Sequence, residues 1–173
     1  MITLVSSTNR PGSFTRRLVH IYQSILEEMD EEVQVLDLIN LPEKLMVTDL
    51  YGKRSSEFLS FQEMVLQSDR FIFFIPEYNG SFPGVLKLFI DALVYPDSFY
   101  GKKAALVGLS SGTYGNIRGV DHFTGIAHYI GLKVLPLKIH IPFIKKEINS
   151  EGNMADGPSL KFIHQQIHDF IAF

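Results

Sequence analysis

The chain has 173 residues, of which 46% are hydrophobic and 20% charged, with a formal net charge of −3. This length is typical of one domain with room for a core, and the near-neutral charge lacks both the basic footprint of a nucleic-acid-binding protein and the acidic tract of a carrier. Because cysteine is absent, disulfides, thiol nucleophiles, thiolate-bound zinc and iron–sulfur clusters are excluded.

The first apolar segment, Met1–Ser6, lacks the basic region that precedes the apolar core of a signal peptide. We therefore expect it to form a buried strand. No stretch of the chain approaches the roughly 20 apolar residues that a membrane span requires. These features predict a soluble, cytoplasmic protein that binds neither nucleic acid nor membrane.

Short apolar runs recur along the chain, and most are unbroken, as in strands that are covered on both faces of a parallel sheet. The predicted strands are Ile2–Val5, Val33–Leu38, Phe71–Ile75, Ala104–Leu109 and Lys133–Leu137.

Segments with helical spacing separate and follow these runs. The first predicted helix has one apolar face, formed by Leu18, Tyr22, Ile25, Leu26 and Met29. Four further helices are predicted at about Ser55 to Gln67, from Pro83 to Leu93, at about Gly119 to Tyr129, and after Pro158. This alternation predicts an α/β fold, a doubly wound sandwich of three layers. Residues 39–54 and 144–157 are expected to be irregular surface excursions of a single domain over residues 1–173.

Ligands bind such sheets beyond the carboxyl ends of the strands. The loop after the first strand offers the hydroxyls of Ser7, Thr8, Ser13 and Thr15, the cation of Arg10, and the N–H groups of a helix start. Neither a G-x-G-x-x-G nor a G-K-[ST] motif is present, and hydroxyls with a single arginine suit a terminal monophosphate better than a pyrophosphate or triphosphate. An ordinary strand–helix turn with Ser13 as the N-cap is the alternative.

The loop after the third strand, Pro76–Gly84, contains two prolines and two glycines that fix an uncommon backbone path. Tyr78 and Phe82 are suited to stack on a flat ring, while exposed N–H groups bond its polar edge. A rigid crossover loop with Tyr78 packed on its neighbours is the alternative.

Residues Pro76–Asp91 read P-E-Y-N-G-S-F-P-G-V-L-K-L-F-I-D. Together with Ser7–Leu18, this segment resembles the NADPH-dependent FMN reductase family, which includes azo, quinone and chromate reductases. The resemblance implies a flavodoxin-like fold with a five-stranded parallel sheet in the order 2-1-3-4-5, and FMN and NADPH as cofactors. This sequence departs from the family pattern at three places. The family has Gly-Ser where this chain has Ser7-Thr8, and Asn where it has Thr15 and Leu88.

The loop after the fourth strand, Gly108–Asn116, resembles the family's G-x-S-x-G-x-x-G loop, which contacts the flavin ring. The resemblance implies that the first loop holds the FMN phosphate and that the second and third loops line the ring. The FMN-binding residues expected on this basis are Ser7, Thr8, Arg10, Ser13, Phe14, Thr15, Pro76, Glu77, Tyr78, Asn79, Gly80, Ser110, Ser111, Gly112, Tyr114 and Gly115.

The third loop also spells G-x-S-x-G, the nucleophile elbow of α/β-hydrolases, for which Asp121 or Asp156 and His164 or His168 would complete a triad in the required order. The short chain and the residues between the motif and the next helix argue against a hydrolase. His164 and His168 have the spacing of a zinc site, but Gln165 replaces the glutamate of H-E-x-x-H, so a solvated helix face is the better interpretation. His122 and His128 are expected near the predicted cleft, with packing as their main role.

The resemblance implies a ping-pong oxidoreductase in which hydride passes from a nicotinamide cofactor through FMN to a small-molecule acceptor such as a flavin, quinone, azo compound or metal oxyanion. No side chain is assigned as catalytic and no metal is expected. A flavodoxin-type electron carrier and a non-catalytic flavin-binding module are the alternatives. The family also implies a homodimer or a dimer of dimers, and the apolar segment Val85–Leu93, with Leu88, is consistent with such a contact.

Overall fold

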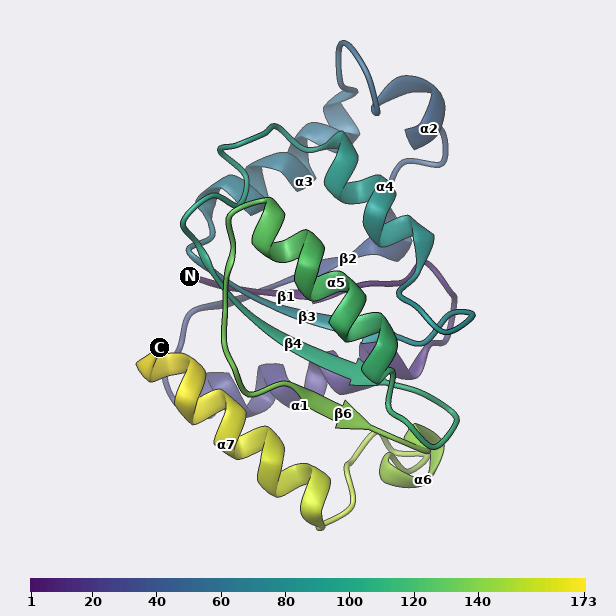
Figure 1. Cartoon of the computed structure of the whole chain (residues 1–173), viewed down its shortest axis with the longest axis vertical. Coiled ribbons are helices and arrows are strands. Elements are labelled where there is room, and N and C mark those ends of the chain that lie inside the picture. Colours follow the sequence, from purple (N-terminus) through teal and green to yellow (C-terminus); the bar gives the residue numbers. More distant parts are fainter.

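A computed structural model describes all 173 residues as a sheet covered by helices on both faces (Figure 1). The strands are β1 (Ile2–Ser6), β2 (Val33–Asp37), β3 (Arg70–Pro76), β4 (Lys103–Leu109), β5 (Lys133–Val134) and β6 (Ile139–Ile141). The helices are α1 (Phe14–Glu28), α2 (Leu45–Thr48), α3 (Ser56–Gln67), α4 (Gly84–Ala92), α5 (Ile117–Tyr129), α6 (Ile144–Glu147) and α7 (Pro158–Ala172), with a short 3₁₀ helix, η1, at Leu38–Asn40.

All strand pairs are parallel, and the order β2-β1-β3-β4-β5 confirms the predicted topology. The fifth position is divided, because β5 and β6 both pair with β4. The sequence predicted one strand over Lys133–Leu137, and that prediction is wrong beyond Val134. Pro136 has no N–H to donate, so the ladder is interrupted there and resumes in β6.

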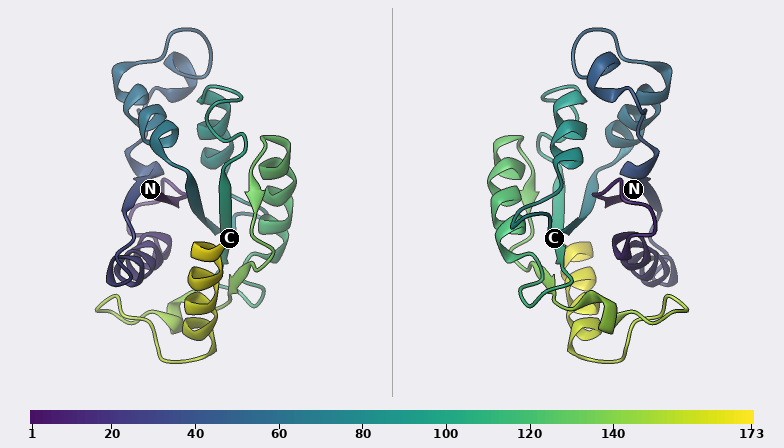
Figure 2. Two further views of the ribbon diagram at one scale, coloured as in Figure 1. Left: turned by 90° about the vertical axis from the view of Figure 1, so that its left-hand side faces the viewer. Right: turned by 90° about the vertical axis from the view of Figure 1, so that its right-hand side faces the viewer.

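Successive residues of the central strand β3 pack into two different core clusters, one on each face of the sheet. Because both faces are buried, the apolar run in the sequence is unbroken. Phe71, Phe73 and Ile75 pack in one cluster with residues of α3, α4 and α5. Ile72 and Phe74 pack in a second cluster with residues of α1 and α7. Figure 2 shows these two helical layers on opposite sides of the sheet. The five long helices therefore lie where the apolar periodicity predicts them.

A buried glutamine on α7 bonds the sheet at the divided strand. Gln166 donates from Nε2 to the carbonyls of Leu106 and Leu137, at 3.1 and 3.0 Å, and its Oε1 accepts the Tyr22 hydroxyl at 2.9 Å. Gln166 and Tyr22 are both fully buried. The Gln166 amide thus donates hydrogen bonds to two backbone carbonyls beside the break between β5 and β6. In a continuous ladder, backbone N–H groups would bond these carbonyls.

The strand order reverses between β1 and β3, since the chain moves from β1 to β2 on one side and then to β3 on the other. Loops that leave the carboxyl ends of these two strands diverge, and the space between them is where doubly wound sheets bind ligands. None of the helices is both long and apolar enough to cross a bilayer.

Candidate functional site

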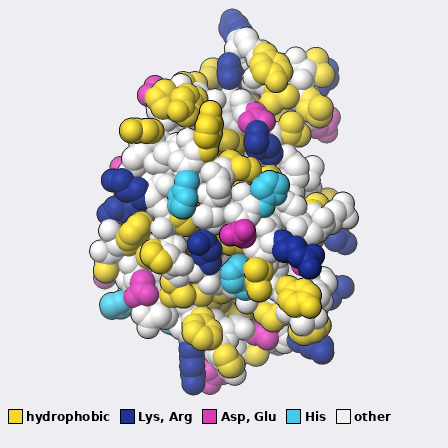
Figure 3. Space-filling view, in the orientation of Figure 1, with side chains coloured by type: hydrophobic (Ala, Val, Ile, Leu, Met, Phe, Trp, Pro, Cys, Tyr) yellow, Lys and Arg dark blue, Asp and Glu magenta, His cyan; other side chains and the backbone are white.

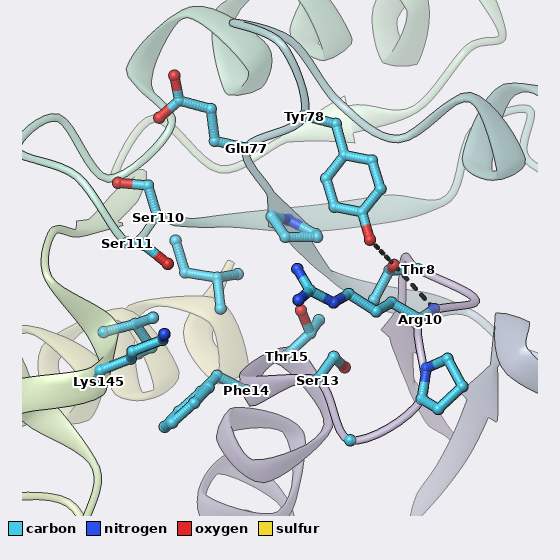
Figure 4. Close-up of a pocket in the computed structure, with 15 residues that line it drawn as sticks. Thr8, Arg10, Ser13, Phe14, Thr15, Glu77, Tyr78, Ser110, Ser111 and Lys145 are labelled. Atoms are coloured by element: carbon cyan, nitrogen blue, oxygen red, sulfur yellow. Dashed lines mark hydrogen bonds between the residues drawn. The ribbon is translucent and has the colours of Figure 1, made fainter.

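A cleft of about 270 Å³ lies at the carboxyl edge of the sheet, between the loops that follow β1, β3 and β4 (Figure 4). These are the three loops that the sequence singled out. The cleft is lined by Thr8, Arg10, Pro11, Gly12, Ser13, Phe14, Thr15, Pro76, Glu77, Tyr78, Leu109, Ser110, Ser111, Ile144 and Lys145.

The first loop leaves the start of α1 without a side-chain cap. Ser13 occupies the N-cap position with extended backbone angles, but its hydroxyl makes no capping hydrogen bond, and the first turn carries no acidic residue. The N–H groups of the first helical turn have no partner within the helix, and they face the end of the cleft where Thr15 contributes a hydroxyl. An uncapped helix start beside hydroxyls is suited to hold an anion.

Two cations face this anion-binding end without a carboxylate to neutralise them. Arg10 extends across the middle of the cleft, and Lys145 approaches from α6 on the opposite side (Figure 4). Neither forms an ion pair within the chain. The carboxylate of Glu77 points away from both (Figure 4). The cleft therefore has an excess of positive charge at the helix start.

A hydrogen bond between two hydroxyls joins the first loop to the second. Thr8 Oγ1 lies 2.7 Å from the Tyr78 hydroxyl, and the same Thr8 oxygen accepts from the Arg10 N–H at 3.2 Å. The bond holds the Tyr78 ring upright as one wall of the cleft (Figure 4). The wall is thus positioned by the loop that carries Arg10.

The second loop folds back as a two-residue hairpin at Asn79-Gly80. Tyr78 and Ser81 exchange backbone hydrogen bonds of 2.9 and 3.0 Å, and the two residues between them have φ of +51° and +76°. Positive φ at both central positions defines a type I′ turn, for which Asn-Gly is the favoured pair. The hairpin fixes Tyr78, while Asn79 and Gly80 form its tip and do not line the cleft.

Phe82 does not serve as the stacking platform that we expected. Its ring packs against His122 and Phe123 of α5, with centroid distances of 5.0 and 5.7 Å. Ser81 Oγ lies 2.9 Å from Nδ1 of His122. These contacts hold the hairpin on α5, and they leave Tyr78 as the aromatic residue of this loop that lines the cleft.

The third loop is fixed by its own serine and by α6. The Ser110 hydroxyl donates to the Gly112 carbonyl and accepts from the Gly115 N–H, both at 3.0 Å. The N–H groups of Phe143 and Ile144 donate back to the carbonyls of Gly112 and Ser110. These four hydrogen bonds fix the backbone of the third loop against α6.

Gly115 allows a close approach, but to β6 rather than into the cleft. Its φ is +54°, and a Cβ at this position would lie 2.6 Å from backbone atoms of His140 and Ile141. The next residue, Asn116, donates to the Ile75 carbonyl at 2.9 Å and caps α5 through Gly119. These contacts tie the third loop to the ends of β3 and β6.

The geometry does not form a hydrolase triad at Ser110, because both hydrogen bonds of its hydroxyl are to backbone groups. α5 begins at Ile117, seven residues later, whereas a nucleophile elbow enters its helix at once. His164 lines a separate groove against α1, and His168 is exposed on α7.

The structure brings together most of the predicted site residues. Those that line the cleft are Thr8, Arg10, Ser13, Phe14, Thr15, Pro76, Glu77, Tyr78, Ser110 and Ser111. Ser7 does not, because its side chain is fully buried and its hydroxyl donates to the Val5 carbonyl at 3.3 Å. The remaining predicted residues lie beside the cleft without lining it: Asn79, Gly80, Gly112, Tyr114 and Gly115.

Sequence reasoning missed Ile144 and Lys145, which α6 brings to the cleft. We expected residues 39–54 and 144–157 to be irregular, and that expectation is wrong for Leu45–Thr48, which form α2, and for Ile144–Glu147, which form α6. The available signal was the short apolar run of β6, which directs the chain back to the carboxyl edge just before Ile144. Of the other histidines, His122 lies beside the hairpin, and His128 lies in the last turn of α5 at its far end.

A model of the NADPH-dependent FMN reductase family matches residues 1–145. A 2-hydroxy-1,4-benzoquinone reductase from Burkholderia sp is 26% identical over 176 residues, which cover 99% of this chain and 94% of that protein. An NAD(P)H-dependent FMN reductase from Pseudomonas aeruginosa is 33% identical over 112 residues, or 62% of this chain and 60% of that protein.

Solved structures show the same fold. The flavoenzyme NAD(P)H:(acceptor) oxidoreductase FerB from Paracoccus denitrificans superposes with a TM-score of 0.81 at 24% identity, covering 99% of this chain and 94% of that one. Oxidised flavodoxin 1 from Bacillus cereus superposes with a TM-score of 0.61 at 18% identity, covering 99% and 96%. The fold is therefore flavodoxin-like, as the resemblance implied.

Proposed function

Because the chain belongs to the NADPH-dependent FMN reductase family, we propose that residues 1–173 form one FMN-binding domain of a cytoplasmic NAD(P)H oxidoreductase that acts on quinones and related acceptors. The observation that carries this proposal is the uncapped start of α1 beside Arg10 and Lys145, which offers N–H donors and two free cations to a monophosphate. FMN held there by the start of α1, Arg10 and Lys145 would supply the redox chemistry that links a nicotinamide cofactor to a quinone, azo compound, flavin or metal oxyanion, in what we propose to be ping-pong order.

The residues at the start of α1 fit the phosphate of FMN. Arg10 and Lys145 supply charge, Ser13 and Thr15 supply hydroxyls, and the first-turn N–H groups supply the remaining donors. The Thr15 hydroxyl stands where the family has an amide, so a donor is kept at this position. The two positive charges of Arg10 and Lys145 match a phosphate monoester, which carries up to two negative charges near neutral pH.

The second and third loops fit a flat ring. Tyr78 forms one wall, and Pro76, Glu77, Ser110 and Ser111 complete the surface on which a ring would lie. Outside the regular elements, the N–H groups of Ser111 and Gly112 make no hydrogen bond within the chain, and they are free to bond a polar ring edge. Such fixed donors stabilise negative charge that develops on a bound ring, as an oxyanion hole does.

We also propose that the protein forms a homodimer, through the surface near α2. Met46, Val47 and Tyr51 are exposed there by 67%, 85% and 86%. Figure 3 shows apolar side chains gathered at this end of the molecule. Leu88, on which the expected contact through Val85–Leu93 depended, is half-buried and packs against the core cluster under α4. Light scattering at micromolar concentration tests the dimer, and a monomer would refute it.

Titration of flavin-free protein with FMN, followed by the quenching of flavin fluorescence, tests the assignment. Arg10→Gln should raise the Kd for FMN by roughly 10- to 100-fold, because a hydrogen bond to a charged group contributes about 1.5–3 kcal/mol. Lys133→Gln removes the same charge at an exposed position at the start of β5, at the edge of the sheet opposite the cleft, and should leave the Kd unchanged.

Turnover then separates the candidate functions. The loaded protein should oxidise NADPH in the presence of a benzoquinone. An electron carrier would bind FMN but accept electrons only from a partner reductase, and a non-catalytic module would bind FMN without turnover. If the protein does not bind FMN at all, the proposed redox function is refuted and only the assignment of the fold remains.

A further inference from the structure

A single asparagine, Asn116, connects the two loops that form the proposed ring site, although it does not line the cleft. It stands between the third loop and α5, with φ of +61° and ψ of +39°, and it is only 1% exposed. This left-handed conformation is the one that glycine adopts most readily. Because the chain carries a buried amide where glycine would suit the backbone, the amide requires an explanation of its own.

Helix capping explains only one end of this side chain. Oδ1 of Asn116 accepts the Gly119 N–H at 3.1 Å and so caps α5. The oxygen of a serine or an aspartate would do the same, and glycine is nearly as good at this position. Asparagine adds a separate N–H₂ donor. Its Nδ2 donates to the carbonyl of Ile75 at 2.9 Å, so the second bond of the amide reaches β3 rather than α5.

The bond to Ile75 joins the bases of the two loops. Ile75 lies two residues before Glu77, which lines the cleft from the second loop. Asn116 directly follows Gly115, whose N–H donates to the Ser110 hydroxyl and closes the third loop. The amide therefore fixes the distance between the Glu77 side of the ring site and the Ser110 side.

The surroundings hold the amide in this one position. A Cβ at Gly119 would collide with the Asn116 side chain, and a Cβ at Gly108 of β4 would collide with the Gly115 carbonyl. Neither Gly108 nor Gly119 has a positive φ, so close packing explains the glycines at these two positions. In so closely packed a junction of β3, β4 and α5, a lost contact shifts the neighbouring backbone instead of being absorbed.

We propose that Asn116 is a positioning residue for the flavin ring, which sets the separation of the second and third loops through its bond to Ile75. The inference rests on the proposed function and extends it, because the bond holds the free N–H groups of Ser111 and Gly112 at a fixed distance from the ring edge. Fixed donors favour a negatively charged ring over a neutral one. Loss of the bond therefore weakens the binding of reduced FMN, whose ring carries a negative charge, more than the binding of oxidised FMN.

Two variants remove the bond to Ile75 and have opposite side effects. Asn116→Gly keeps the left-handed backbone and most of the capping and adds no charge, but it leaves a space. Asn116→Asp keeps the size and the cap but adds a negative charge. An effect that both variants share follows from the donor that both have lost. Tyr22→Phe is the control for stability, because it removes a buried hydrogen bond to Gln166 in the cluster between the sheet and α7.

The test compares the affinities of the two oxidation states. Fluorescence titration gives the Kd for oxidised FMN, and anaerobic equilibration with a reference dye gives the reduction potential of the bound flavin, from which the Kd for reduced FMN follows. Asn116→Gly and Asn116→Asp should each weaken the binding of reduced FMN about 2- to 12-fold more than that of oxidised FMN. Tyr22→Phe should leave the ratio of the two Kd values as it is in the wild-type protein.

Urea unfolding verifies that the variants fold, and Asn116→Gly alone decides if Asn116→Asp does not. A lower urea midpoint in Asn116→Gly with an unchanged ratio of the two Kd values would show that the amide only stabilises the fold, and it would overturn the inference. A ratio that changes in Asn116→Asp alone would do the same, because the added charge would then be the cause. So would an equal change in Tyr22→Phe. Wild-type protein that takes up no FMN would instead refute the proposed function.

Discussion

Alanine substitutions at Gly80 and Gly115 separate two reasons for which a loop requires glycine. Both residues have positive φ, +76° and +54°. At Gly80 a Cβ would meet only the end of the Arg118 side chain, at 3.9 Å, which is an ordinary contact. At Gly115 it would lie 2.6 Å from two backbone atoms of β6, which cannot rotate away. Gly84, at the start of α4, has neither constraint.

The expected losses follow from these differences. The left-handed conformation costs an alanine about 1–2 kcal/mol, and the stiffer unfolded chain offsets about 0.4–1 kcal/mol of that cost. Gly80→Ala should therefore lower the free energy of unfolding by up to about 1.6 kcal/mol. Gly115→Ala adds an overpacking cost of about 1–3 kcal/mol, for a total loss of roughly 1–4.6 kcal/mol. Gly84→Ala should gain up to about 1 kcal/mol.

Urea denaturation of the three flavin-free variants, followed by far-ultraviolet circular dichroism, measures these differences from the transition midpoints and slopes. Equal losses at Gly80 and Gly115 would show that the third loop does not approach β6 as closely as the structure places it. A loss at Gly84 as large as that at Gly80 would show that positive φ is not the cause.

Three further outcomes are expected. Tyr22→Phe leaves the buried Oε1 of Gln166 without its donor and should lower the free energy of unfolding by about 1–3 kcal/mol in the same urea assay. The control is Tyr129→Phe, at a position 84% exposed, which should change the free energy of unfolding by less than about 0.5 kcal/mol. Burial lowers the pKa of His140 below its ordinary value of 6.5, so between those two values the unfolded chain binds a proton that the folded chain does not, and stability rises with pH. Urea midpoints should accordingly climb as the pH rises toward the ordinary pKa of 6.5, and the slope should be smaller in His140→Gln; identical slopes would contradict the assignment. Tyr78→Phe removes the hydroxyl that meets the first loop and should raise the Kd for FMN roughly 2- to 12-fold in fluorescence titrations; an unchanged Kd would show that this bond does not position the cleft wall.

The layered fold could be predicted because buried parallel strands and amphipathic helices leave strong periodic signals. Phe71–Ile75 is apolar at every position because both faces of β3 are covered, and the face of α1 that contains Leu18, Tyr22 and Leu26 is buried as its spacing requires. The divided strand could not be predicted in the same way. Pro136 marks the break, but only the tertiary structure shows that β6 resumes pairing with the same neighbour.

The candidate site was predictable to the extent that its residues lie next to strand ends. Arg10 and Tyr78 follow β1 and β3 directly, so topology alone brings them together. Lys145 was not predictable, because it reaches the cleft through a four-residue helix that packs on the third loop. Phe82 was assigned to the ring by chemical type and Gly115 by the resemblance to the family, whereas their packing on α5 and β6 depends on contacts that the linear pattern does not contain.

The interruption at Pro136 also affects how the molecule meets other copies of itself. β5 and β6 form one border of the sheet, and a long, straight border strand offers a row of free backbone groups to any passing chain. Here that row is divided between a strand of two residues and one of three, and Pro136 lacks a donor, so intermolecular strand addition is disfavoured at this border. The border formed by β5 and β6 is thereby protected against the edge-to-edge pairing that leads to fibrous aggregation.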